Sequence, residues 1–116
     1  ETNGIIGSHK LKKLYGSYIE AGKTYGYEIL GKGKLSEKKL SCEMGSYGMT
    51  LESKGNLYLT GKGVTIFNPK GEKITNIPID EDWTSNVTFG GKDHSTLFIT
   101  ASHSVYTLPM NVSGIK

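Results

Sequence analysis

The sequence predicts an all-β protein whose strands form the blades of a β-propeller. Two observations lead to this prediction. The chain of 116 residues combines 16 Gly and 7 Tyr with only 3 Pro, a composition that favours short strands joined by tight turns. The same order of strand and turn signals also recurs three times, at a spacing near 40 residues.

The most regular strand pattern lies in the middle of the chain. Short apolar or alternating runs are separated by glycine-containing turns, and one of these turns has Pro69 at its second position. Residues 57–60 are apolar and aromatic enough to be buried on both faces. The pattern predicts an antiparallel meander of four strands, at residues 49–51, 57–60, 64–67 and 73–79.

Comparable strand signals lie on both sides of this meander. The expected strands before it are at residues 2–7, 14–15, 23–30 and 40–44, with a hairpin turn at 31–33. The expected strands after it are at residues 85–91, 97–100 and 105–108. The third unit therefore lacks an outer strand.

The three units open with related triplets. These are Asn3-Gly-Ile, Tyr47-Gly-Met and Asn86-Val-Thr, which start 44 and 39 residues apart. Such an ordered repeat favours propeller blades over a sandwich or a barrel, neither of which needs it. We therefore expect about three four-stranded blades, half of a six-bladed propeller, at approximately residues 1–45, 46–84 and 85–116.

The composition argues against several classes of partner. The net charge of +3 comes from lysines without any arginine, so we expect no nucleic-acid partner. No apolar run approaches the roughly 18 residues of a membrane span, so we expect no membrane insertion.

The one cysteine, Cys42, excludes an internal disulfide and is expected to be a small buried hydrophobe. Because the chain begins at Glu1 rather than Met, we expect that an upstream segment was removed by processing or truncation.

The motifs resemble the C-terminal half of the senescence marker protein (regucalcin)/gluconolactonase family. The matching segments are Asn3-Gly4 and residues 48–59, 67–72, 86–91 and 97–101. Members of that family are six-bladed propellers that hold a divalent cation, commonly calcium, in a central channel and hydrolyse sugar lactones and related esters. The resemblance implies a calcium or zinc cofactor and a small sugar lactone as the substrate.

The resemblance also assigns roles to single residues. The family binds its cation through a Glu near the N-terminus, an Asn and an Asp, and the Asp also activates water. Asn3 matches the metal-binding Asn, whereas Tyr47 stands at the position of the catalytic Asp, and the Glu has no counterpart in this chain. A phenol is neutral at pH 7, so it is a poor ligand for a hard cation and a poor base. We therefore expect weak or absent metal binding and an inactive Tyr47; Tyr18 likewise stands where relatives often carry Asp.

The candidate residues also have structural interpretations. Asn3 fits a turn without metal, and Tyr47 fits simple packing better than a stacking surface. Asn86, the candidate substrate-binding residue, fits a cap of neighbouring strand ends equally well. Trp83 follows an acidic segment and fits an anchor between blades better than a carbohydrate platform. The three histidines share no ligand spacing and are expected to be solvated, at positions His9, His94 and His103.

Two classes of function follow. One is a lactonase-like hydrolase in which a channel cation polarises a carbonyl group and activates water. The alternative is a non-catalytic half-propeller that acts as a binding or self-assembly module.

Three blades form an open arc with an apolar face at each end, so we expect a homodimer that completes a six-bladed ring. The residues expected on the two faces are Tyr25, Tyr27 and Ile29 at one end and Val105, Tyr106 and Leu108 at the other.

Overall fold

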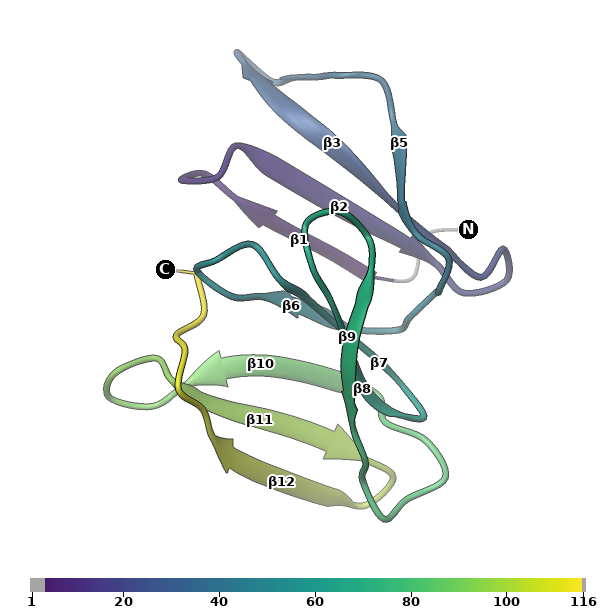
Figure 1. Ribbon diagram of the computed structural model, residues 1–116, viewed down its shortest axis with the longest axis vertical. Helices are drawn as coiled ribbons and strands as arrows, with labels where there is room; N and C mark the ends of the chain where they lie inside the picture. Colours follow the sequence, from purple (N-terminus) through teal and green to yellow (C-terminus); the bar gives the residue numbers. More distant parts are fainter. Residues whose placement is uncertain (1–3, 116) are drawn as a thin grey trace.

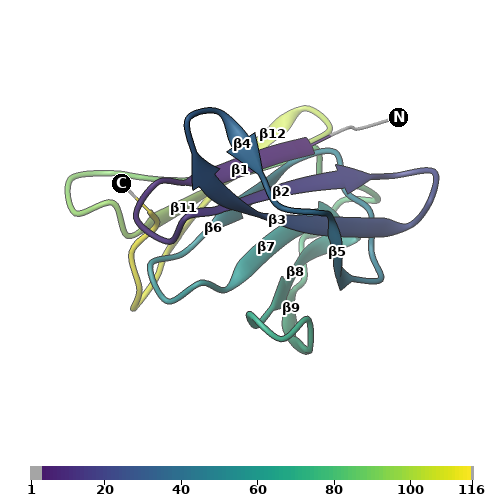
Figure 2. The same ribbon diagram turned by 90° about the horizontal axis from the view of Figure 1, so that it is seen from above.

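The computed structural model describes residues 4–115, which form twelve β-strands in three antiparallel sheets and contain no helix (Figure 1). The sheets follow one another along the chain and lie side by side. In the turned view, β9 lies on the opposite side of the molecule from β1 (Figure 2). Within residues 4–115, nothing resembles a helix that could cross a membrane.

The first sheet is larger than the sequence predicts. Its order is β1-β2-β3-β4, and β5 also pairs with β3, because the long third strand extends past β5 to a short hairpin. Lys32 and Gly33 form that hairpin and both have positive φ, as a tight two-residue turn requires. The sequence predicts the turn but not the two-residue strand β4 after it. The strands are β1 (Gly4–Ser8), β2 (Lys13–Tyr18), β3 (Lys23–Gly31), β4 (Lys34–Leu35) and β5 (Lys39–Cys42).

The second sheet is the predicted four-stranded meander. Gly55 and Gly71 donate backbone hydrogen bonds to Glu52 and Asn68, and both glycines have positive φ, which confirms two of the predicted turns. Every residue of β7 and β8 is buried, so the prediction of burial on both faces is confirmed for residues 57–60. The strands are β6 (Met49–Leu51), β7 (Leu57–Gly61), β8 (Gly63–Phe67) and β9 (Lys73–Ile77).

The third sheet has three strands, in the order β10-β11-β12. They are β10 (Asn86–Gly90), β11 (Thr96–Ala101) and β12 (Ser104–Pro109). After β12 the chain turns back toward β6, where the Ile115 amide donates to Leu51 and the Ser53 amide donates to Ser113. The predicted unit boundaries at residues 45 and 84 fall between the sheets and stay a prediction.

The core consists of two apolar layers, one on each side of the second sheet. The layer shared with the first sheet includes Tyr15, Cys42, Met49, Leu51, Leu57, Leu59 and Phe67. The layer shared with the third sheet includes Tyr58, Val64, Ile66, Val87, Phe89, Leu97 and Ile99. Cys42 is buried as expected, and this burial raises the pKa of its thiol to about 11, so the thiol is protonated at neutral pH.

Buried hydroxyl groups join the sheets where the chain passes from one to the next. Thr84 is fully buried, and its Oγ1 lies 2.9 Å from the Gly61 carbonyl oxygen and 2.5 Å from that of Gly63. The Gly61 amide in turn donates to Thr84 Oγ1 at 2.9 Å. One threonine thus binds both sides of the β7–β8 turn to the segment that leads into the third sheet. Ser46 and Thr60 form a similar buried contact, with their hydroxyl oxygens 2.9 Å apart.

A buried carboxylate lies at the opposite end of the second sheet. Glu52 is only 2% exposed, and its two oxygens accept hydrogen bonds from Asn56 Nδ2 at 2.5 Å and from the Tyr58 hydroxyl at 2.6 Å. Burial and the hydrogen bond to Glu52 raise the pKa of the Tyr58 hydroxyl. The two donors compensate for the removal of the carboxylate from water.

Two expectations about single residues are wrong. Tyr106 does not lie on the uncovered face of the third sheet, because it pairs with the buried Ile99 and packs against the core. Leu108 pairs with Leu97 on the same face but stays exposed at the edge of the sheet. The alternation leaves Val105 exposed on the other face. His94 is half-buried rather than solvated, because its Nε2 hydrogen-bonds the Ile115 carbonyl oxygen at 2.8 Å.

Thr84→Val tests the hydroxyl junction between the second and third sheets. The substitution preserves shape but leaves the Gly61 amide without its partner, so we expect the free energy of unfolding to fall by about 2 kcal/mol. Urea denaturation measures this change. The matched control is Thr107→Val, at an exposed threonine of β12, for which we expect a change within about 0.5 kcal/mol. Equal effects of the two substitutions would contradict the assigned role of Thr84.

Candidate functional site

The starts of the three sheets come together, although they are far apart in the sequence. Strand β6 contacts both β1 and β10, so the first strands of the three sheets are neighbours (Figure 1). A Cβ atom on Gly4 would lie 3.1 Å from the Tyr47 carbonyl oxygen, and one on Gly48 would overlap the Asn86 amide group. Glycine at these two positions therefore permits the close approach of the repeat openings. We call the group formed by Tyr47, Gly48, Trp83 and Asn86 the strand-start site.

Tyr47 and Trp83 form an exposed aromatic pair in this site. Their ring centroids are 6.1 Å apart and the rings are inclined by 76°, which is an edge-to-face contact. Tyr47 is 49% exposed and Trp83 is 44% exposed. The two residues precede different sheets, so sequence spacing gives no sign of this contact. The contact is compatible with packing at Tyr47 and with an anchor between blades at Trp83, and both rings also keep exposed surface, so the roles of these two residues stay predictions.

Asn86 lies at the start of β10, against Gly48, the residue that follows Tyr47, and it is exposed. Its Oδ1 accepts a hydrogen bond from the adjacent Val87 amide at 2.9 Å, which matches the strand-end interpretation. Among residues 4–115 no acceptor binds its Nδ2 group, which is therefore available to a ligand. Asn3, the candidate metal ligand, lies outside the described residues.

The described part of this site does not fit a divalent cation. A hard cation prefers several anionic or carbonyl oxygens, whereas the side chains here are a phenol, an indole and an amide whose oxygen already accepts a hydrogen bond. Nowhere in residues 4–115 do three or more His, Cys, Asp or Glu side chains come close enough to hold a metal ion. In the nearby acidic segment, Glu81 accepts a hydrogen bond from the Tyr106 hydroxyl at 3.0 Å.

Tyr18, which stands where relatives often carry Asp, belongs to a different cluster. Its ring packs edge-to-face on Tyr25, with centroids 5.6 Å apart. The ammonium group of Lys38 lies 4.6 Å from the Tyr25 ring centroid, within the range of a cation–π contact. The cluster contributes aromatic surface to the first sheet and is not part of the strand-start site.

The sequence model of one protein family, the SMP-30/gluconolactonase/LRE-like region, matches residues 1–103 of this chain. The chain belongs to this family. It is 28% identical, over 133 aligned positions, to an uncharacterized protein of Sulfolobus acidocaldarius, and the match covers 99% of this chain and 48% of that protein. The resemblance inferred from the motifs is therefore confirmed.

Solved structures of similar proteins share the fold. A protein assigned to a gluconolactonase family superimposes with a TM-score of 0.88 at 22% identity, over 100% of this chain and 41% of that one. A luciferin-regenerating enzyme and a calcium-binding regucalcin of Agrobacterium tumefaciens both give TM-scores of 0.81, at 20% and 18% identity. These matches cover 99% and 97% of this chain and 48% and 47% of the other two. The chain thus has the fold of part of a propeller and spans less than half the length of these relatives.

The aromatic contact can be tested by fluorescence, because Trp83 is the one tryptophan of the chain. Tyr47 covers part of the indole ring, so we expect Tyr47→Ala to shift the emission to longer wavelength and to increase quenching by acrylamide. Tyr47→Phe keeps the ring and serves as the matched control, for which we expect the parent spectrum. Identical spectra for the Ala and Phe variants would contradict the contact.

Proposed function

We propose that this chain provides blades of a gluconolactonase-like propeller that binds a small sugar-like ligand at the strand-start site without metal-dependent hydrolysis. The observation that carries the proposal is the exposed Tyr47–Trp83 pair at the position where the family resemblance expects the catalytic Asp. An aromatic pair in place of a carboxylate favours binding over proton transfer.

The chemistry of the three side chains supports a ligand of this class. Aromatic rings pack against the apolar faces of sugar rings, and amide groups orient the hydroxyl or carbonyl groups of a ligand. No described residue accepts a hydrogen bond from Asn86 Nδ2, which can therefore donate one to a ligand next to Gly48. None of the three side chains has an acidic or basic group suited to activate water at neutral pH. These three described side chains therefore suit recognition better than lactone hydrolysis.

Metal-dependent lactone hydrolysis is the second candidate, and the match to the family model over residues 1–103 favours it. One similar solved structure is assigned to a gluconolactonase family and another is described as calcium-binding. In this candidate, Asn3 and ligands from outside the chain hold calcium or zinc, and Tyr47 is the residue that reduces activity. Tyr47→Asp restores the carboxylate, and an assay of lactone hydrolysis with calcium or zinc on this variant separates the two candidates.

Gluconolactone provides the first test. We expect a saturable change in Trp83 fluorescence on titration, together with hydrolysis no faster than in buffer, with or without calcium or zinc. Tyr47→Ala should abolish the fluorescence response, whereas Tyr47→Phe should retain it. Gluconate must be titrated separately, since the lactone opens spontaneously. Calcium- or zinc-dependent turnover by the parent chain would overturn the proposal and support the second candidate.

We further propose that the uncovered face of the first sheet is an assembly surface occupied by a second copy of the chain. Ile5, Gly16, Tyr25 and Leu40 are directly paired across four strands and therefore share one face. Ile5 is 67% exposed and Leu40 is 50% exposed. Apolar surface of this kind on a sheet normally marks an interface. Two chains that each have the fold of part of a propeller can close on one another through such faces.

Ile5→Lys tests this assembly. The side chain is exposed in the single chain, so the substitution should leave folding intact while it places a charge in the interface. We expect sedimentation equilibrium to give a dimer for the parent chain at micromolar concentration and a monomer for the variant. Ile74→Lys, at an exposed isoleucine of β9, is the matched control and should remain dimeric. A parent chain that is monomeric under these conditions would refute the dimer.

A further inference from the structure

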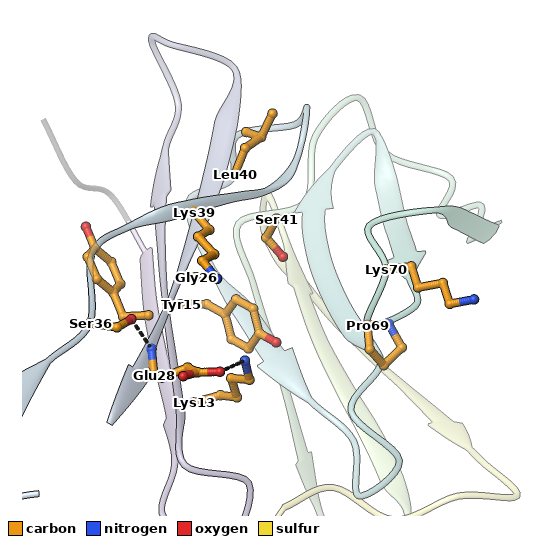
Figure 3. A pocket seen from close by; sticks show the side chains of 11 residues that line it. Lys13, Tyr15, Gly26, Glu28, Ser36, Lys39, Leu40, Ser41, Pro69 and Lys70 are labelled. Carbon is orange, nitrogen blue, oxygen red and sulfur yellow. Dashed lines mark hydrogen bonds and ion pairs between the residues drawn. The ribbon is translucent and has the colours of Figure 1, made fainter. Parts of the chain in front are cut away.

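A pocket lies between the first sheet and the β8–β9 turn of the second sheet (Figure 3). It has a volume of about 190 Å³, with walls from β2, β3 and β5 on one side and from Pro69 and Lys70 on the other. It includes no residue of the strand-start site. The turn is held close to β5, since a Cβ atom on Gly71 would overlap the Ser41 carbonyl oxygen.

Tyr15 gives this pocket a hydroxyl group that no described residue binds and that solvent in the pocket can reach. The side chain is only 8% exposed and belongs to the core, but its hydroxyl group faces the pocket (Figure 3). No residue in the range 4–115 forms a hydrogen bond with that hydroxyl, whereas every fully enclosed side-chain nitrogen or oxygen atom in this range has a partner. Burial, with a smaller contribution from Cys42, raises the pKa of Tyr15, so the phenol remains a hydrogen-bond donor.

The pocket also contains a positive charge that no described carboxylate neutralises. Lys39 extends from β5 toward the Tyr15 ring, and its ammonium group forms no ion pair with any residue from 4 to 115 (Figure 3). Lys13 pairs with Glu28 at 3.3 Å, so the carboxylate in the pocket is already neutralised. Lys70 lies at the rim and points away. The uncompensated charge is therefore that of Lys39.

The floor of the pocket is kept open by a glycine. A Cβ atom on Gly26 would lie 3.2 Å from the Tyr15 ring, so a larger residue would crowd the space beside the phenol. The pocket thus combines a cation, an unused neutral donor and room for one small group. These are the components of a charge-assisted hydrogen-bonding site for an anion.

We propose that this pocket binds a small oxyanion, a phosphate or carboxylate group, through the Tyr15 hydroxyl and the Lys39 ammonium group. The oxyanion satisfies the free donor and neutralises the free charge at the same time. Because the pocket walls belong to two sheets, a bound anion also connects the first sheet to the second, and it stabilises the folded chain by mass action. The site is independent of the proposed function, because it uses none of the residues assigned to sugar binding.

The experiment is an NMR titration of the full chain with sodium phosphate and, separately, sodium gluconate, with sodium chloride added to keep the ionic strength constant. We expect at least one oxyanion to cause saturable shifts centred on the amides of Gly26, Lys39 and Ser41. Saturable shifts with phosphate alone, with gluconate alone or with both show which type of oxyanion the pocket binds. Saturation by neither would overturn the proposal.

Three variants distinguish a built site from general attraction to lysines. Tyr15→Phe removes only the hydroxyl and Lys39→Gln removes only the charge, and we expect each to raise the Kd by about tenfold. Lys92→Gln, at an exposed lysine of the β10–β11 turn, is the matched control and should change the Kd by less than about twofold. Lys39 is itself exposed, so its variant gives a result even if Tyr15→Phe does not fold.

The outcomes that oppose the proposal are equally specific. Equal weakening by Lys39→Gln and Lys92→Gln, or shifts spread over many lysine-bearing turns, would mean an adventitious ion only. An unchanged Kd in a folded Tyr15→Phe variant would remove the phenol from the site and contradict the proposed mode of binding. Retention of gluconolactone binding at Trp83 in these variants would show that the two sites are separate.

Discussion

Burial of both faces of the second sheet is the constraint on which the rest of this structure depends. Strands β7 and β8 have no residue that faces water, so the sheet requires an apolar layer from each neighbour. Tyr15 and Cys42 contribute from one side, and Val87 and Phe89 contribute from the other. The three sheets are therefore mutually dependent: the first and third each cover one face of the second, although each leaves its own outer face uncovered.

The same constraint explains the polar contacts between sheets. Where buried layers meet, the backbone groups of the connecting segments lose water and need partners from the protein. Ser46, Thr60 and Thr84 provide these partners with short side chains that fit where larger ones would not. Gly48 and Gly71 remove the Cβ atom at the two points where neighbouring segments approach most closely. Small polar residues and glycines thus determine how tightly adjacent blades pack.

The two proposed binding sites lie where this packing is incomplete. The Tyr47–Trp83 pair lies where the starts of the second and third sheets meet, and the Tyr15–Lys39 pocket lies between the first and second sheets. In each case a side chain has more hydrogen-bonding or stacking capacity than its neighbours use. Family membership accounts for the fold that creates these junctions, whereas the chemistry at each junction depends on the residues of this chain.

The sequence by itself determined the strands, the tight turns and the repeat. These depend on alternation and on glycines such as Gly55 and Gly71, which act within a few residues. The repeat also identified the openings at Tyr47 and Asn86, and the motifs identified the family. The edge-to-face contact with Trp83, the buried face of Tyr106 and the free hydroxyl of Tyr15 were decided only by tertiary structure. The physical reason is that each of these features depends on packing between units, which leaves no periodic signal in the chain. The alternation of a strand separates its two faces, but only the neighbouring sheet determines which face is covered and which polar group lacks a partner.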